Sequence, residues 1–199
     1  MAVVNYGVGN LRSIRKGLEK SGANVKITHS PEELRSSDAI VLPGVGAFAP
    51  AVRNLAPIAD VVAEEMKSGK PILGVCLGLQ LLFTRSSEGG SIPGLDFISG
   101  DIVKLPENVK IPQMGWNTLN IVQSHLLLEG VKDSSYVYFV HSYYPQPSDP
   151  EVIVATTEYG VRFPSMVTKK NLFATQFHPE KSSKTGLTIL KNFVRIVKR

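Results

Sequence analysis

The chain has 199 residues, of which 43% are apolar, a net charge of +5 at pH 7 and one cysteine. This length suits one domain over residues 1–199 that buries its own core. A single cysteine excludes an intrachain disulfide, and no apolar run is long enough to span a membrane. Because the basic residues are scattered, with nothing longer than short pairs such as Lys169-Lys170 and Lys198-Arg199, we expect a solvated surface and neither a nucleic-acid nor a membrane partner. The first residues lack the basic region of a secretory leader, so we expect a cytoplasmic protein.

Strand and helix signals alternate through the first half of the chain. Apolar runs predict strands at Ala2–Val4, Asn24–Thr28, Ala39–Leu42 and Ile72–Val75. Between them, apolar residues recur at helical spacing after Asn10 and again up to Met66, and Ser30-Pro31 marks another helix start. Strands separated by helices favour a mostly parallel open sheet, and therefore an α/β fold.

The second half shows short strands joined by turns. Runs at Ile102–Leu105, Val137–Val140, Val152–Thr157 and Leu172–Thr175 predict strands without long helices between them. Apolar residues at helical spacing from Thr185 onward predict one closing amphipathic helix. We therefore expect a mixed or antiparallel strand region added to the parallel sheet.

The most informative stretch follows the fourth strand. Gly74-x-Cys76-x-Gly78 has the form of a nucleophile elbow, in which small flanking residues allow a strained turn from strand to helix. Leu79, Leu82 and Phe83 then recur at helical spacing, so we expect a helix that starts at Cys76 and includes them. Such a helix start favours thiolate over thiol, and its free N–H groups can bind a developing oxyanion. Alternatively, Cys76 is a small buried apolar residue, although that interpretation leaves the two glycines unexplained.

A second stretch supplies a base. His178 and Glu180 follow the predicted strand Leu172–Thr175, and the proline between them restricts the backbone. In that arrangement a carboxylate can hold an imidazole, and the imidazole can activate a thiol.

With both stretches in view, the sequence resembles the class I, triad-type glutamine amidotransferases, over essentially the whole chain. The resemblance implies that Cys76 is the nucleophile, His178 the general base and then acid, and Glu180 the residue that orients His178. The reaction it implies is hydrolysis of L-glutamine to glutamate and ammonia, with no metal or organic cofactor.

The same resemblance implies further site residues. The loop Pro43–Gly46 matches the one that supplies an oxyanion donor, so Gly44 and Val45 are expected there together with the amide of Leu77. Gln80 matches a position that contacts the substrate. Ser142 and Tyr143 lie in a segment whose backbone holds the α-amino and α-carboxylate groups of glutamine in the family. From the residues alone, Pro43–Gly46 could equally be a tight turn and Gln80 a solvated helix residue.

Three further motifs narrow the branch of the family. The stretches at residues 5–11, 114–117 and 138–144 are similar to those of the glutaminase subunits of imidazole glycerol phosphate synthases, which act in histidine biosynthesis. Asn5 departs from the acidic residue of many relatives. The resemblance implies a heterodimer with a HisF-type (β/α)8-barrel cyclase that receives the ammonia. The candidate interface residues are Asn10, Trp116, Asn117, Tyr136 or Tyr138, and Lys181.

Other functions stay open at this point. The chain could be the glutaminase component of anthranilate, aminodeoxychorismate or pyridoxal phosphate synthesis. A DJ-1/PfpI-like protein also sets a cysteine on an elbow, although its partner residues are not expected to be His-Pro-Glu. A non-catalytic binding subunit is the third alternative.

Overall fold

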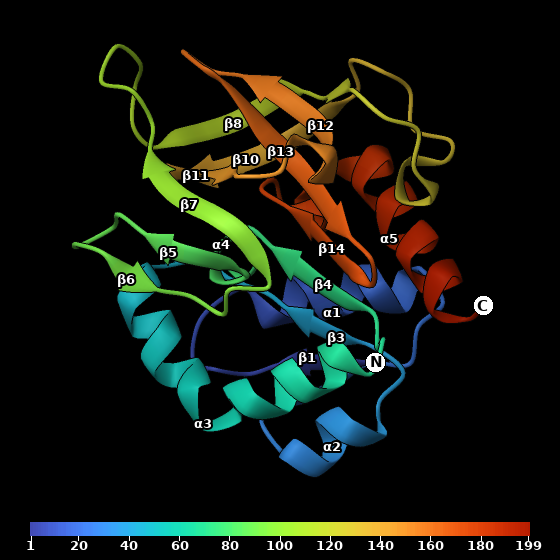
Figure 1. The fold of residues 1–199 in the computed structure, drawn as a ribbon. Helices are drawn as coiled ribbons and strands as arrows, with labels where there is room; N and C mark the ends of the chain where they lie inside the picture. Colours follow the sequence, from blue (N-terminus) through green and yellow to red (C-terminus); the bar gives the residue numbers. More distant parts are fainter.

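The computed structural model describes residues 1–199 and places an eight-stranded sheet at the centre of the molecule (Figure 1). Five adjacent strands of this sheet run parallel, in the order β2 (Lys26–Thr28), β1 (Ala2–Val4), β3 (Ile40–Leu42), β4 (Ile72–Val75) and β14 (Leu172–Thr175). Three antiparallel strands complete it, in the order β13 (Arg162–Lys169), β12 (Ile153–Glu158) and β9 (Asn120–Ile121). The expected parallel sheet with an antiparallel extension is therefore confirmed.

Helices cover both faces of the parallel strands because the strand residues alternate between two apolar clusters. Val3, Val41 and Leu73 belong to one cluster, which also contains apolar residues of α1 (Leu11–Lys20) and α5 (Ser183–Val197). Their neighbours along the same strands belong to the other cluster, with α2 (Pro31–Ser36) and α3 (Phe48–Lys67). The period of two along each strand thus assigns α1 and α5 to one face and α2 and α3 to the other.

Side chains fix the starts of two helices. Asn10 accepts a hydrogen bond from the N–H of Ser13 and caps α1, and Ser30 accepts one from Glu33 and caps α2. Such caps satisfy backbone donors that the first helical turn leaves free. The predicted start of α2 at Ser30-Pro31 is confirmed.

Two smaller sheets lie beside the main one. The first pairs β8 (Gln113–Thr118) with β10 (Tyr136–His141) in antiparallel register, with Trp116 opposite Tyr138. The second has the order β11 (Tyr143–Pro147), β7 (Ile98–Lys104), β5 (Phe83–Ser86) and β6 (Ile92–Pro93). Short 3₁₀ turns occupy Leu126–Leu128, Pro150–Val152 and Pro179–Lys181.

The helix after Cys76 is shorter than its apolar spacing predicts. Helix α4 covers only Leu77–Leu81, and Phe83 already begins β5. Leu82 and Phe83 are fully buried, and an apolar run satisfies burial equally well as helix or strand. The expectation that Leu82 and Phe83 continue the helix is therefore wrong.

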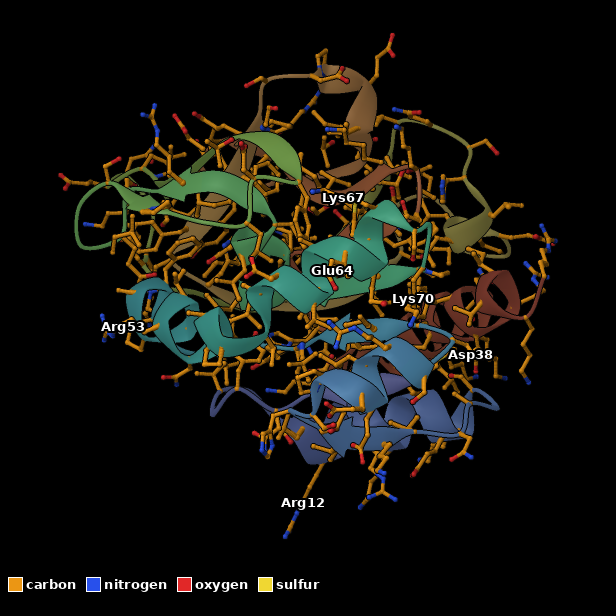
Figure 2. All side chains as sticks on the ribbon, turned by 60° about the horizontal axis from the view of Figure 1, so that its bottom comes forward. Arg12, Asp38, Arg53, Glu64, Lys67 and Lys70 are labelled. Carbon is orange, nitrogen blue, oxygen red and sulfur yellow. The ribbon has the colours of Figure 1, made fainter.

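Charges of both signs are spread over the part of the surface that Figure 2 turns forward. Figure 2 shows Arg12, Arg53 and Lys67 well separated from one another, with Glu64 between them and Asp38 to the right. Lys70 forms a largely buried pair with Glu65, at 2.6 Å between Nζ and Oε2. No helix combines the length and apolar character needed to cross a bilayer.

Candidate active site

The elbow is built at the carboxyl end of β4. Cys76 has φ 53° and ψ −107°, a strained conformation for a residue with a side chain. A Cβ on Gly78 would lie 1.8 Å from the carbonyl oxygen of Leu42, and one on Gly74 would lie 2.8 Å from that of Gly78. The two glycines therefore allow α4 to pack directly against β3 and β4, which turns Cys76 to the edge of the sheet.

His178, the predicted base, lies at the same edge because β14 pairs in parallel with β4. Thr175 is opposite Val75, and the N–H of Cys76 donates a hydrogen bond to the carbonyl of Thr175 at 2.7 Å. Three residues beyond Thr175, His178 Nδ1 lies 2.9 Å from Oε1 of Glu180. Both side chains are at least 95% buried, so the carboxylate holds the imidazole away from water.

The charge on His178 is set by its burial and by its two neighbours. His178 Nε2 is buried and has no hydrogen-bond partner of regular geometry. Burial lowers the pKa of His178, but the neighbouring Cys76 and Glu180 side chains outweigh it and raise the pKa to about 10. The Cys76 and Glu180 side chains thus both favour the charged imidazole, although Nε2 has no aligned hydrogen bond to the thiol. Catalytic contacts of this kind commonly tighten only when substrate binds.

A cavity of about 260 Å³ opens beside the thiol. The sequence-predicted residues Val45, Cys76, Leu77, Gln80, Ser142 and Tyr143 line it, together with Gly46, Glu88, Pro112, Val140 and His141. Substrate and oxyanion residues predicted from three separate segments thus line one cavity. Gly44, His178 and Glu180 are not among the residues that line the cavity.

The loop Pro43–Gly46 is tightly enclosed at its first two residues. The hydroxyl of Tyr6 donates to the carbonyl of Pro43, and a Cβ on Gly44 would lie 2.6 Å from that of Leu77. By contrast, Val45 is 37% exposed and Gly46 has φ +128°, a conformation that favours glycine. Burial, with a smaller effect from Cys76, raises the pKa of Tyr6, which stays a neutral donor.

Comparisons with known proteins identify the family of the chain. The family model of the class I glutamine amidotransferases matches residues 2–197. Imidazole glycerol phosphate synthase subunit HisH of Archaeoglobus fulgidus is 52% identical, with both chains covered completely, and that of Methanosarcina acetivorans is 50% identical over 98% of each chain. The chain belongs to the class I glutamine amidotransferases, in the HisH branch. A crystal structure of a glutamine amidotransferase superposes with TM-score 0.78 at 19% identity, covering 100% of this chain and 99% of that one, which supports the fold.

In this amidotransferase, the candidate interface residues do not line the cavity. Trp116 is 51% exposed and meets Tyr138 edge to face, with ring centroids 5.7 Å apart, and Lys181 Nζ lies 6.0 Å from the Tyr138 ring centroid. Asn117 has its side chain bonded to the carbonyl of Glu158 at 2.9 Å, and Asn10 caps α1. Trp116, Tyr138 and Lys181 thus form one cluster, whereas Asn117 and Asn10 have structural partners of their own.

Two polar residues of the amidotransferase site carried no predicted role. His141 lies 2.9 Å from both the carbonyl of Tyr143 and Oε1 of Gln113, and burial lowers its pKa to about 4. Gln176 contacts the sulfur of Cys76, and only its place two residues before His178 could have drawn attention to it. Nowhere do three or more His, Cys, Asp or Glu side chains gather so that they could hold a metal ion.

Proposed function

We propose that this HisH-type chain hydrolyses the side-chain amide of L-glutamine through a thioester on Cys76, and that the ammonia is used by a HisF-type barrel cyclase. The observation that carries the proposal is the meeting of Cys76, His178 and Glu180 at one sheet edge, next to the cavity of about 260 Å³. A nucleophile, a base and a residue that orients the base are the parts that acyl transfer requires.

In the first half-reaction, His178 Nε2 takes the thiol proton and the sulfur of Cys76 attacks the amide carbon of glutamine. The carbon–nitrogen bond then breaks, and His178 returns the proton to the leaving nitrogen. Ammonia and a γ-glutamyl thioester are the products. Glu180 keeps Nδ1 of the imidazole occupied, so that Nε2 faces the reacting atoms.

In the second half-reaction, water attacks the thioester while His178 accepts its proton. The carbon–sulfur bond breaks, glutamate leaves and the thiol is restored. Both tetrahedral intermediates carry an oxyanion that needs N–H donors. We assign these donors to the backbone of Leu77 and of the Gly44-Val45 segment. The assignment is supported by position, because Val45 and Leu77 both line the cavity beside Cys76.

The cavity beside Cys76 also identifies the residues that we assign to substrate binding. We assign Gln80, Ser142 and Tyr143 to glutamine binding, because all three line the cavity. Strand β11 begins at Tyr143 directly after the bend at Ser142, so the backbone changes direction at the wall of the cavity.

An exposed apolar face supports the proposal that a partner subunit binds this chain. Met114 and Trp116 on β8, and Tyr136 on β10, are 66%, 51% and 62% exposed. Aromatic residues exposed on one small sheet are typical of interface anchors. The same strand β10 contains Val140, whose carbonyl lies 3.5 Å from the sulfur of Cys76, so a partner on this face sits next to the point where ammonia is released.

The products of the complete enzyme are proposed from its relatives' names, which identify them as subunits of imidazole glycerol phosphate synthase. The cyclase joins ammonia to a phosphorylated ribulosyl-formimino precursor and forms imidazole glycerol phosphate and an aminoimidazole carboxamide ribonucleotide. This chain would therefore supply the nitrogen for a step of histidine biosynthesis.

The test is Cys76→Ala in the complex with the cyclase. We expect synthesis from glutamine to be lost and synthesis from added ammonia to remain near the wild-type rate, because the cyclase needs only the nitrogen. Glutamate release and product formation measure the two activities separately. Loss of both in a complex that still assembles would contradict the proposed division of labour, as would glutamate release that survives the substitution.

A further inference from the structure

The side-chain amide of Gln176 lies between the predicted substrate residue Gln80 and the nucleophile. Its Nε2 is 3.6 Å from the sulfur of Cys76, within the range of a hydrogen bond to sulfur. Its Oε1 is 3.2 Å from Nε2 of Gln80, which also donates to the carbonyl of Tyr143 at 2.9 Å. The amides thus form a short chain from a backbone carbonyl to the thiol.

The direction of this chain is fixed at its far end. A backbone carbonyl can only accept, so Gln80 must direct its NH₂ group toward Tyr143. The same NH₂ group faces Gln176, which must therefore present its oxygen. The NH₂ group of Gln176 is left facing the sulfur of Cys76. Rotating either amide by 180° would place two donors or two acceptors against each other.

Gln176 is also held in place. Its side chain is fully buried, and its backbone N–H donates to the carbonyl of Ser165 at 2.9 Å. The residue follows β14 directly and precedes the buried Phe177. A fixed donor of this kind loses little conformational entropy when charge develops on its acceptor.

The contacts of the sulfur differ in what they do when the proton leaves. In the neutral thiol, S–H can donate to the carbonyl of Val140 at 3.5 Å, while the sulfur accepts from Gln176 at 3.6 Å. A carbonyl cannot donate to a thiolate, so the contact with Val140 is lost on ionisation. The contact with Gln176 becomes a charge-assisted hydrogen bond and strengthens.

We infer that Gln176 is a further catalytic residue, whose amide N–H stabilises the Cys76 thiolate formed when His178 takes the thiol proton. The inference deepens the proposed glutaminase reaction and rests on Cys76 being its nucleophile. No bond other than S–H breaks in this step, and the proton goes to Nε2 of His178. Gln176 donates throughout and is never deprotonated.

The experiment follows alkylation of the thiol by iodoacetamide as a function of pH, in wild type and Gln176→Met. Only the thiolate reacts, and the chain has one cysteine, so the profile reports Cys76 alone. Methionine has a similar volume and no N–H. We expect the midpoint of the profile to move upward by about one to two pH units, the range for a lost hydrogen bond to a charged group. For glutamine hydrolysis near neutral pH, kcat/KM should fall about 10- to 100-fold, mostly through kcat.

Asn192→Leu is the matched control. Asn192 is another buried amide, and it donates to the carbonyls of Leu127 and Glu129, away from the thiol. We expect this variant to lose stability without moving the alkylation midpoint. If Gln176→Met does not fold, Gln176→Leu replaces it.

An unchanged midpoint in a folded Gln176 variant would overturn the inference, even if turnover falls. A midpoint that moves equally in the Asn192 control would also overturn it, because the effect would then be one of stability. Alkylation needs no glutamine, so failure of the wild type to release glutamate would count against the proposed function alone.

Discussion

At the scale of single residues, the site depends on a buried ion pair that controls which nitrogen of His178 is free. Glu180 lies against Nδ1 at 2.9 Å, and both side chains are shielded from water. A lone buried imidazolium would be costly, so the charge on His178 depends on its two neighbours. The pair therefore makes stability depend on pH.

The sign of that dependence follows from the pKa of His178, which rises from 6.5 to about 10 on folding. Between these values the folded chain binds a proton that the unfolded chain has lost. The contribution of His178 to stability is therefore complete below pH 6.5 and is lost as pH rises toward 10. In Glu180→Gln we expect the unfolding free energy to fall less steeply over this window, as measured by urea denaturation. Equal slopes of unfolding free energy against pH in the two proteins would contradict the assigned role of Glu180. Glu129→Gln serves as the control, because Glu129 forms an exposed ion pair with Arg195.

Residue-level prediction succeeds where neighbouring residues determine the geometry. His178 and Glu180 are two positions apart, and one proline is enough to place them on one side. The contact of Gln176 with Gln80 joins residues 96 positions apart and depends on how α4 packs against β14. No local pattern contains that information, so this part of the site appears only in three dimensions.

At the scale of elements, the elbow requires that α4 lie almost against β3. A Cβ on Gly78 would be 1.8 Å from the carbonyl oxygen of Leu42. Because this contact is with backbone, α4 or β3 would have to shift to relieve the clash. For Gly78→Ala we expect the unfolding free energy to fall by about 3 kcal/mol or more, with loss of glutaminase activity.

Gly22→Ala is the matched control for that substitution. Gly22 has φ +91°, but nothing lies within 4 Å of the position of its Cβ. This variant should lose only about 1 to 2 kcal/mol, the cost of the left-handed conformation. Denaturant titration of both variants measures the difference, and similar losses would contradict the steric account of the elbow.

Element prediction works for strands that are apolar without interruption. The predicted β1, β4 and β14 agree with the structure to the residue, because each is buried on both faces and reads as a continuous apolar run. The strands β8, β11 and β13 were not predicted. β11 contains two prolines and β13 one, which in isolation argue against a strand. Pairing of β11 with β7, and of β13 with β12 and β14, overrides that local preference.

At the scale of the whole molecule, the exposed sheet β8–β10 links the site to an outer surface. Trp116 and Tyr138 pack edge to face on it. For Trp116→Ala we expect the dissociation constant for a HisF-type cyclase to rise about 30-fold or more, the effect of losing one interface anchor, with the fold intact. Leu126→Ala removes a residue of similar exposure, 47%, from a different segment and should leave the affinity unchanged. Calorimetric titration measures both, and equal effects would remove the β8–β10 face from the proposed interface.

The most direct test of the whole account is to find the acyl group on Cys76 during turnover. The complex is mixed with isotope-labelled glutamine, quenched in acid within one turnover, digested and mapped by mass spectrometry. We expect a labelled γ-glutamyl group on the peptide that contains Cys76, and none in Cys76→Ala. Label on another residue, or steady glutamate release with Cys76 unmodified at every time point, would contradict the account.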